Sequence, residues 1–454
     1  MLTSADALRI PAPLIARYDT PGPRYTSYPT VPAWSRDVGP AVYDTALRAV
    51  GAAAAPLAVY AHFAYCTTKC YYCGCTALAT SRAATVDRYL DDLERELDRV
   101  VEALGRGRTV AQLHWGGGTP NLLDDAQLVR AFLLFTDRFR LASDAEVSIE
   151  ADPRLVTSAQ LDTLRALGFT RISFGVQDLD PDVQTAIGRI QPASLVREVV
   201  AMARAAGFEG INLDLIYGLP RQTAASFGRT IEAALAMRPD RVACFGYAHL
   251  PAQRAHQRMI LDAELPDAGL RFELFRMAAA AFTAAGYAWL GLDHFASPDD
   301  PLAVAQREGR LHRNFMGYTT MPGQHLVGVG LSAISDVDGH FAQNAPGLAA
   351  WREAVAAGAL PTIRGHVRSE QDRARQAAIQ HLMCNLVLPF TMAPWCPTAL
   401  RGRYARYAAD GLVRFEPDRL VVTDLGRFFL RNLCMELDAY LPEQAGRARF
   451  SRTV

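Results

Sequence analysis

Four cysteines lie within ten consecutive positions of the chain, at Cys66, Cys70, Cys73 and Cys75. They follow the spacing C-x3-C-x2-C-x-C, so half of the 8 cysteines stand in one short loop. Thiolates are soft ligands for zinc, copper or iron–sulfur clusters, and they also act as redox groups. The loop therefore predicts metal or redox chemistry around residue 70.

The spacing of the first three cysteines favours an iron–sulfur cluster over the alternatives. A structural zinc site needs a fourth closing ligand, but the sequence has no second C-x2-C pair and no H-x3–5-H pair. Disulfides are disfavoured in a reducing compartment. Three thiolates suit three irons of a [4Fe–4S] cube and leave the fourth iron open to a small molecule. A zinc knuckle and a pair of redox thiols stay open as alternatives.

A glycine triplet and a set of polar residues add to this expected site. Gly116, Gly117 and Gly118 in HWGGGTP end a predicted strand, and glycines let a ligand approach the backbone closely. A triplet alone is also compatible with a plain turn. Barrel enzymes collect their catalytic groups at the carboxyl ends of the strands. Polar side chains are found at or near such ends in the next three predicted strands: Glu150, Gln177 and Asp214.

Alternating strand and helix patterns position these residues. The predicted strands cover 57–63, 111–116, 146–152, 171–177, 211–218 and 241–248, with amphipathic helical stretches between them. Repeated β-then-α units imply parallel strands joined by crossover helices. Six units in a row favour a partial (β/α)6, TIM-like barrel over a Rossmann sheet. The predicted fold class is therefore α/β.

The chain divides into four predicted segments. They are an N-terminal arm over 1–55, a catalytic domain over 56–335, a linker over 336–365 and a smaller C-terminal domain over 366–454. The C-terminal domain is expected to be mostly helical, with helices near 369–386 and 398–409, a β-hairpin over 412–423 and a final helix over 424–441. This order is reminiscent of a winged helix. A lid or packing domain is favoured, because the net charge gives no nucleic-acid footprint.

Composition limits the partners of the chain. The 454 residues carry a formal net charge of zero, which argues against broad electrostatic capture of nucleic acid or anionic membrane. We find neither a secretory leader nor an apolar stretch of membrane-spanning length, so a cytoplasmic location is expected. The cysteines outside the loop are expected to be small buried hydrophobes: Cys244, Cys384, Cys396 and Cys434.

The cysteine loop resembles that of the radical S-adenosylmethionine (SAM) superfamily. In that superfamily the open iron binds the amino and carboxylate groups of SAM, and one electron from the cluster then releases a 5′-deoxyadenosyl radical. The resemblance implies that Cys66, Cys70 and Cys73 ligate a [4Fe–4S] cluster. It also implies that Tyr72 contacts the adenine and that the glycine triplet binds the methionyl amine.

Longer stretches resemble the oxygen-independent coproporphyrinogen III oxidase family, from about residue 14 to the end. They include PGPRYTSYPT, LHWGGGTPN, SIEADPR, NLDLIYGLP, GYTT and ARFSRTV. The resemblance implies oxidative decarboxylation of two propionate side chains of coproporphyrinogen III to vinyl groups, giving protoporphyrinogen IX. It further implies an electron donor of the flavodoxin or ferredoxin type and an unidentified electron acceptor. We expect a monomer.

The same resemblance implies roles for individual residues. Cys75, Glu150 and Tyr60 are the expected catalytic residues. The first SAM is expected to contact Tyr60, Tyr72, Gly117, Glu150 and Ile334. A second SAM is expected to contact Gly118, Thr119, Gln177, Arg189, Asp214 and Ala248.

Two departures from the family pattern keep other functions open. The chain reads HFAYC where the family usually reads HIPFC, and Met316 stands where the family has a glutamine. An anaerobic haem-opening methyltransferase shares much of this framework, and a haem chaperone would use His62 or another histidine as an axial ligand. We also hypothesise that Arg24, in PGPRYTSYPT, clamps a substrate carboxylate.

Overall fold

The structure is a computed structural model that describes residues 10–52, 55–321, 323–441 and 450–453. The predictions made for 1–9, 53–54, 322, 442–449 and 454 lie outside the described residues, including part of the N-terminal arm and of the ARFSRTV stretch. Within the described ranges, no helix is long and apolar enough to cross a membrane.

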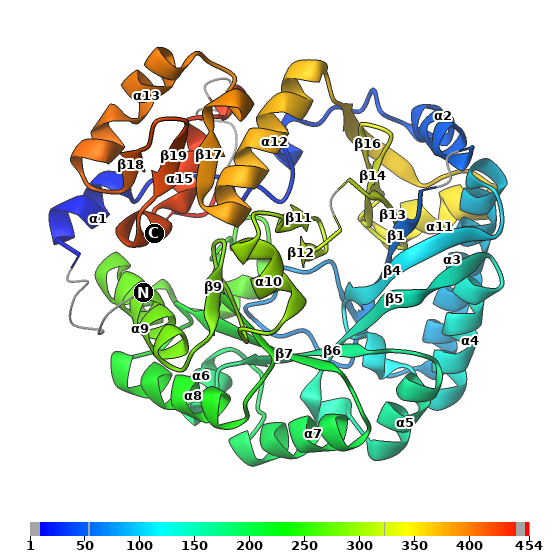
Figure 1. The fold of residues 1–454 in the computed structure, drawn as a ribbon. Helices are drawn as coiled ribbons and strands as arrows, with labels where there is room; N and C mark the ends of the chain where they lie inside the picture. The colour runs from blue at the N-terminus through cyan, green and yellow to red at the C-terminus, as the bar shows by residue number, and fades with distance from the viewer. Residues whose placement is uncertain (1–9, 53–54, 322, 442–449, 454) are drawn as a thin grey trace.

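A curved sheet of twelve strands forms the centre of the molecule, with helices around its outer face (Figure 1). Its strands, in spatial order, are β16 (Thr362–Val367), β15 (His340–Asn344), β14 (Ile334–Val337), β13 (His325–Val329), β1 (Leu57–Phe63), β4 (Arg108–Gly117), β5 (Phe139–Ala151), β6 (Arg171–Gln177), β7 (Gly210–Tyr217), β8 (Arg241–Gly246), β10 (His294–Ala296) and β9 (Ala288–Leu290). The strands from β13 to β8 in this order pair in parallel. The α/β partial barrel predicted from the sequence is confirmed.

Strand alternation decides which side chains enter the barrel interior. In β6 the burial alternates along RISFGVQ, so that Ile172, Phe174 and Val176 are buried while the residues between them are less so. Alternate residues of a strand point to opposite faces. The apolar set packs under the helices, and Ser173 and Gln177 are left on the interior face, where they line a cavity.

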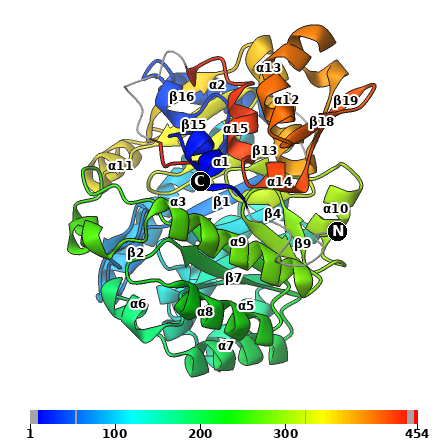
Figure 2. The same ribbon diagram turned by 90° about the vertical axis from the view of Figure 1, so that its left-hand side faces the viewer.

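Amphipathic helices cover the outer face of the parallel strands (Figures 1 and 2). In α3 (Ala83–Leu104), Leu90, Leu93 and Leu97 recur at helical spacing and are all buried. Side-chain caps fix the starts of several helices. In one of them, the Asp124 carboxylate accepts from the N–H of Gln127, and the Gln127 side chain accepts from the N–H of Asp124 in return. The other helices of this layer are α4 (Asp125–Thr136), α5 (Ser158–Ala166), α6 (Pro181–Ala186), α7 (Ala193–Ala205), α8 (Ala224–Ala236) and α9 (Ala268–Ala284).

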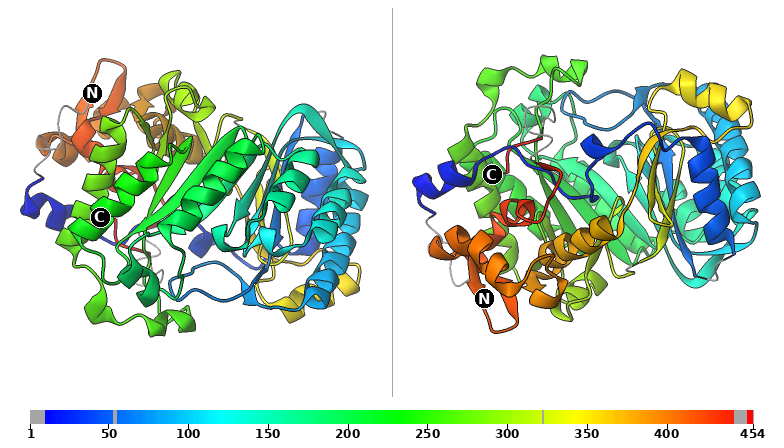
Figure 3. Two further views of the ribbon diagram at one scale, coloured as in Figure 1. Left: turned by 90° about the horizontal axis from the view of Figure 1, so that it is seen from below. Right: turned by 90° about the horizontal axis from the view of Figure 1, so that it is seen from above.

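The N-terminal arm runs beside the C-terminal elements (Figure 3). It contains α1 (Ala12–Tyr18), the 3-10 turn η2 (Val31–Ala33) and α2 (Pro40–Gly51). The Asn432 amide donates to the carbonyl of Tyr18 over 2.8 Å, and Arg431 donates to the carbonyls of Gly22 and Pro23. These contacts join segments about 410 residues apart in sequence and fix the arm against the end of the chain.

The C-terminal elements contain the predicted helices and hairpin, but they include a further short strand and 3-10 turn that were not predicted, and the last helix differs. They are α12 (Glu370–Asn385), β17 (Val387–Pro389), η7 (Phe390–Met392), α13 (Pro397–Ala409), β18 (Val413–Phe415), β19 (Arg419–Val422), α14 (Asp424–Arg427) and α15 (Leu430–Met435). The single helix predicted over 424–441 is wrong, because Phe429 leaves the helical conformation at φ −111° and ψ 19°. Phe428 and Phe429 are both buried, and two adjacent residues of one helix point about 100° apart. Ending the helix between them lets both rings enter the core.

Residues 336–365, predicted as a linker, continue the main sheet. They contain β15 and α11 (Leu348–Ala356) together with parts of β14 and β16. β14 pairs antiparallel with β13, and β15 and β16 follow it outward. The division of the chain into domains stays a prediction.

The elements beside the carboxyl ends of the strands and at the edge of the barrel are short. They are β2 (Tyr65–Cys66), β3 (Leu78–Ala79), η3 (Pro120–Leu122), η4 (Pro153–Leu155), η5 (Ala255–Met259), η6 (Asp262–Glu264), α10 (Pro301–Arg307), β11 (His312–Asn314) and β12 (Gly317–Thr319). β11 and β12 pair with each other as a hairpin.

Candidate active site

The four clustered cysteines lie in the loop that follows β1. Short pairing between β2 and β3 closes this loop at its base. Cys70 is buried, Cys66 and Cys73 are half-buried, and Cys75 is exposed; all four are free thiols. All four line one cavity of about 440 Å³, which we call the cysteine cavity.

Each of the three predicted ligand thiols has a polar neighbour. The Thr119 hydroxyl donates to Cys66 Sγ over 3.1 Å, and a guanidinium nitrogen of Arg189 lies 3.7 Å from Cys70 Sγ. The Cys75 N–H donates to Cys73 Sγ over 3.4 Å. Hydrogen bonds from the Cys75 thiol and then from its N–H, together with the charges of Lys69 and Arg189, lower the pKa of Cys73 to about 6 against the effect of burial. Burial raises the pKa of Cys66 to about 11.

This donor set fits an iron–sulfur cube better than a single ion. In the part of the chain that the structure describes, no three His, Cys, Asp or Glu side chains stand close enough together to hold one metal ion. A cube spreads its thiolates over separate irons, so its ligands stand farther apart than those of one ion. The charges of Lys69 and Arg189 also favour the thiolate form of Cys73. The residues present therefore fit the cluster that the sequence implies.

The glycine triplet at the end of β4 brings the backbone close to the cavity. Gly117 has φ +106°, and a Cβ built on it would lie 2.4 Å from the ring of His62. A Cβ on Gly118 would lie 2.6 Å from the carbonyl oxygen of Phe63. The Gly117 N–H donates to Glu150 Oε2 over 2.9 Å. No residue larger than glycine fits these two positions without displacing a neighbour.

Glu150, at the end of β5, stands where three cavities meet. It lines the cysteine cavity, a cavity of about 300 Å³ beside Tyr60 (the tyrosine cavity) and one of about 210 Å³ inside the barrel (the barrel cavity). Its Oε1 lies 3.6 Å from His114 Nε2. Burial raises the pKa of Glu150. The interaction with His114 and the hydrogen bond from the Gly117 N–H have the opposite and larger effect, so the pKa lies below the usual value. Glu150 is therefore an anion in neutral solution.

Tyr60 lies on β1 and lines the tyrosine cavity with Ile334. Its ring stacks on His114 with centroids 5.9 Å apart, and its hydroxyl lies 3.1 Å from His62 Nδ1. Burial raises the pKa of Tyr60 well above its usual value, so the phenol stays protonated. Met316 lines the same cavity, so the residue that departs from the family pattern lies beside the predicted cofactor contacts.

Arg189 anchors the far side of the cysteine cavity. It donates to Asp152 Oδ2 over 3.0 Å and to the carbonyl of Gly175 over 2.8 Å, and it is almost fully buried. Asp214 lines the same cavity; burial, with the charge of Glu150, raises its pKa to about 7. The cavity thus has a fixed cation on one wall and a carboxyl group that is half protonated at neutral pH on another.

The structure brings the predicted site residues to two adjoining cavities. The cysteine cavity is lined by Cys66, Cys70, Tyr72, Cys73, Cys75, Gly117, Gly118, Thr119, Glu150, Gln177, Arg189, Asp214 and Ala248. Tyr60 and Ile334 line the tyrosine cavity instead, and Glu150 belongs to both. Three positioning residues were missed: His62, which was weighed only as a haem ligand, His114 and Asp152. The alternation of β4 places His114 on the same face as Gly116, and this signal was present in the sequence.

One expectation does not fit the structure, and the proposed role of Arg24 stays a prediction. Cys396 is exposed, because it occupies the N-cap position of α13, whereas Cys244, Cys384 and Cys434 are buried as predicted. Arg24 lies 3.3 Å from Asp293 Oδ2 and donates to the carbonyl of Gly246, so a carboxylate of the protein already pairs with its guanidinium.

Comparisons with known proteins agree with this geometry. The sequence profile of the radical SAM superfamily matches residues 60–234. The chain is 41% identical over 459 residues to the oxygen-independent coproporphyrinogen III oxidase of Pseudomonas aeruginosa, covering 99% of this chain and 100% of that one. Identity to the Escherichia coli protein of the same name is 42% over 451 residues, covering 97% and 98%.

A solved structure of similar fold supports the same relationship. The solved structure of coproporphyrinogen III oxidase (HemN) from Escherichia coli, described as a radical SAM enzyme, superposes with a TM-score of 0.86 at 40% sequence identity. The match covers 92% of this chain and 97% of that chain, so it extends well beyond the barrel.

Proposed function

The chain belongs to the oxygen-independent coproporphyrinogen III oxidase family of radical SAM enzymes, and we propose that it carries out the reaction of that family. It is an oxidoreductase that uses a [4Fe–4S] cluster and SAM. Its substrate is coproporphyrinogen III, and two propionate side chains become vinyl groups as each loses carbon dioxide, one hydrogen and one electron.

Cys66, Cys70 and Cys73 would hold the cluster, and Gly117 and Glu150 would hold the SAM beside it. When both are bound they supply a 5′-deoxyadenosyl radical, which abstracts a hydrogen that no side-chain base can remove. The chain's own residues bind and orient the SAM and the substrate, and they exclude water from the site. Glu150 is an anion held by the Gly117 N–H and by His114, and such a carboxylate suits a cationic amine or a ribose hydroxyl.

The neighbourhood of Tyr60 suits the placement of a substrate side chain. Tyr60 presents a protonated phenol, fixed by stacking on His114, towards a cavity that also meets Glu150. Cys75 is exposed at the rim of the cysteine cavity, and its N–H already binds Cys73 Sγ. We assign Cys75 and Tyr60 to positioning the substrate and the radical precursor rather than to ligating iron.

We also propose that two SAM molecules bind. All six contacts predicted for the second SAM, among them Thr119, Arg189 and Ala248, line the cysteine cavity. Tyr60 and Ile334, two of the contacts predicted for the first SAM, line the tyrosine cavity. Glu150 lies at the junction of the two. Nine of the eleven predicted SAM contacts line the cysteine cavity, which leaves the tyrosine cavity for the reacting side chain of the substrate. Equilibrium dialysis of the reconstituted protein against labelled SAM should then give two equivalents per chain.

The partners and location follow from the same chemistry. We propose a small flavodoxin- or ferredoxin-like electron donor and a monomeric enzyme in the cytoplasm. A reducing compartment suits eight unpaired cysteines, as the structure has them.

One observation carries the proposed function: three thiols, two glycines of the triplet (Gly117 and Gly118) and Glu150 line a single cavity. The test is to incubate the anaerobically reconstituted, reduced enzyme with SAM and either coproporphyrinogen III or haem, and to analyse the products. Loss of two carboxyl groups from coproporphyrinogen III with formation of 5′-deoxyadenosine supports the proposal. Consumption of haem instead would favour the methyltransferase, and a stable Soret band without 5′-deoxyadenosine would favour a haem chaperone.

A further inference from the structure

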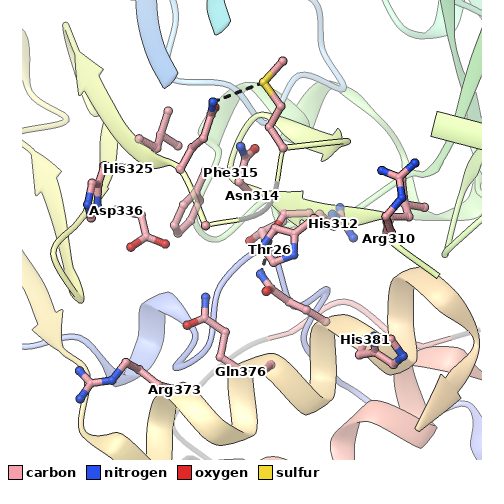
Figure 4. A pocket seen from close by; sticks show the side chains of 18 of the residues that line it. Thr26, Arg310, His312, Asn314, Phe315, His325, Asp336, Arg373, Gln376 and His381 are labelled. Atoms are coloured by element: carbon pink, nitrogen blue, oxygen red, sulfur yellow. Dashed lines mark hydrogen bonds between the residues drawn. The ribbon is translucent and has the colours of Figure 1, made fainter. Parts of the chain in front are cut away.

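A fourth cavity lies outside the barrel, between the β11–β12 hairpin and helix α12 (Figure 4). Its volume is about 540 Å³, the largest of the cavities described above. Figure 4 shows Arg373, Gln376 and His381 on the helical wall, with Asn314 and Phe315 on the opposite side. We call it the outer cavity.

A single turn of the β11–β12 hairpin separates the outer cavity from the barrel cavity and the tyrosine cavity. Asn314 lines both the outer cavity and the barrel cavity, and Phe315 lines both the outer cavity and the tyrosine cavity. The Phe315 ring also packs edge-on against Trp34 and Phe341, which holds it at this boundary. A ligand with several arms could therefore place one arm beside Tyr60 and another in the outer cavity.

The outer cavity carries an excess of positive charge. Its lining includes Arg310, Arg313, Arg368 and Arg373 but only one acidic residue, Asp336. Asp336 is already paired with Arg368. The lining therefore has three further guanidinium groups that face no carboxylate of their own cavity.

Among the residues that the structure describes, one of these arginines has no carboxylate partner. Arg373 donates to the backbone carbonyl of Arg368 over 3.0 Å, and no carboxylate pairs with it among the residues that the structure describes. Arg313 is different: it is 6% exposed, its guanidinium donates to the carbonyl of Arg24 and lies over the Tyr318 ring, and the negative charge of Asp293 already stabilises it. Arg310 pairs only with Glu308, on the exposed surface. Arg373 is therefore an exposed guanidinium that can pair with an anion bound in the cavity.

Neutral hydrogen-bond donors complete the lining. Gln376, Gln380 and Thr26 line this space. The Gln380 amide donates to the carbonyl of Arg313 and the Gln376 oxygen accepts from Arg368, so each amide keeps a hydrogen for a ligand. Guanidinium, amide and hydroxyl groups together are the donors that bind carboxylates, with arginine giving the strongest and most directional bonds. The chemistry of the cavity therefore selects an anion with several oxygen acceptors.

We propose that the outer cavity binds the propionate side chains that are not decarboxylated, while a reacting side chain passes Phe315 into the tyrosine cavity. This inference rests on the proposed function, because it takes the substrate to be a tetrapyrrole with four carboxylates, two of which remain in the product. Those two need cationic partners throughout the reaction. Arg310 and Arg373, which are exposed and line the cavity, supply them.

The test measures porphyrin binding without turnover. Coproporphyrin III and protoporphyrin IX, the stable oxidised forms of substrate and product, are titrated into the full-length protein and followed by porphyrin fluorescence. Arg310→Gln and Arg373→Gln change exposed side chains, so both should fold. Each should weaken the binding of both porphyrins about tenfold, because a charged hydrogen bond is lost in each case. Arg197→Gln, an exposed arginine of α7, is the matched control and should leave both affinities unchanged.

Comparing the two porphyrins shows which propionate side chains occupy the outer cavity. Equal loss with both porphyrins supports the inference, since protoporphyrin IX retains only the two unreactive propionates. Loss with coproporphyrin III alone would place the reacting side chains in the outer cavity and overturn the inference. Wild-type binding with unchanged affinity in both variants would also overturn it and leave the proposed function standing. If the wild-type protein bound neither porphyrin, the inference would fail, and the product analysis would still decide the proposed function.

Steady-state turnover gives a second readout. A contact to an unreactive propionate is the same before and during the reaction, so Arg373→Gln should raise KM and leave kcat unchanged. A fall in kcat at unchanged KM would contradict the assignment, because it would place Arg373 at the reacting group.

Discussion

The substitution Gly117→Ala tests whether the close approach of β4 to β1 is needed to hold the cysteine cavity in its observed shape. Gly117 has φ +106°, and its Cβ would lie 2.4 Å from the His62 ring. Gly105 offers a matched control, since its φ is +91° but a Cβ there meets nothing within 4 Å. Alanine at either position must adopt a backbone conformation with positive φ, which is strained. Only at position 117 does the added Cβ also clash with a neighbouring side chain.

The structure sets the size of the two effects. A left-handed conformation costs an alanine about 1–2 kcal/mol, and overpacking against a fixed ring adds about 1–3 kcal/mol. We therefore expect Gly117→Ala to lose about 2–5 kcal/mol and Gly105→Ala only about 1–2 kcal/mol. For a chain of this length the entropy of unfolding makes 1 kcal/mol worth about 1 °C in melting temperature.

Two assays follow the loss. Differential scanning calorimetry of the apoprotein at one scan rate should place Gly117→Ala below Gly105→Ala by roughly 1–3 °C. His62 Nε2 lies 2.8 Å from the carbonyl of Thr76 in the cysteine loop, so displacing the ring should also lower the iron retained after anaerobic reconstitution. Gly105→Ala should retain wild-type iron.

A double-mutant cycle identifies the clash itself. If the His62 ring is the obstacle, the extra cost of Gly117→Ala should disappear in a His62→Ala background. Equal melting temperatures and equal iron contents for the two alanine variants, or the same extra cost with and without the His62 ring, would refute the steric argument.

Two further predictions concern Glu96 and Thr119. Burial raises the pKa of Glu96 to about 7 against three hydrogen-bond donors, so the folded state holds this proton longer than the unfolded chain does. Its contribution to stability is full below the unfolded pKa, near 4.5, and is lost as pH rises through 7, on the order of 3 kcal/mol. Glu96→Gln should flatten the melting temperature of the apoprotein between pH 5 and 8, and an unchanged slope would count against the argument. Thr119→Val removes the hydroxyl that donates to Cys66 Sγ, and hydrogen bonds to cluster sulfurs raise reduction potentials. Redox titration followed by electron paramagnetic resonance, without SAM, should show a midpoint lower by roughly 40 mV, with Thr136→Val as control; an equal or higher midpoint would contradict this role.

Local patterns in the sequence predicted the barrel well. The strand RISFGVQ has the same bounds in the structure as in the sequence prediction, because alternation of buried and partly exposed residues is a local property. The C-x3-C-x2-C loop and the glycine triplet carry their chemistry in residue type and spacing alone. For such elements a single sequence is sufficient.

Features that depend on distant pairing were not predictable in the same way. β14, β15 and β16 are strands because they extend the sheet outward from β13, and their short sequences carry little periodicity of their own. The break at Phe429 follows from the need to bury two adjacent rings, which no helical pattern displays. The outer cavity joins the hairpin to α12, about 65 residues later in the chain, so only the folded structure brings Arg373 near Phe315.

The ligand assignment is tested most directly by the iron content of single cysteine variants after anaerobic reconstitution. Cys66→Ala, Cys70→Ala and Cys73→Ala should each lose the cluster, while Cys75→Ala and the wild type should retain about four irons per chain. Addition of SAM to the reduced wild-type protein should then change the paramagnetic spectrum of the cluster, as binding at an open iron requires. Loss of iron in Cys75→Ala equal to that in Cys73→Ala, or a spectrum that does not respond to SAM, would contradict the account.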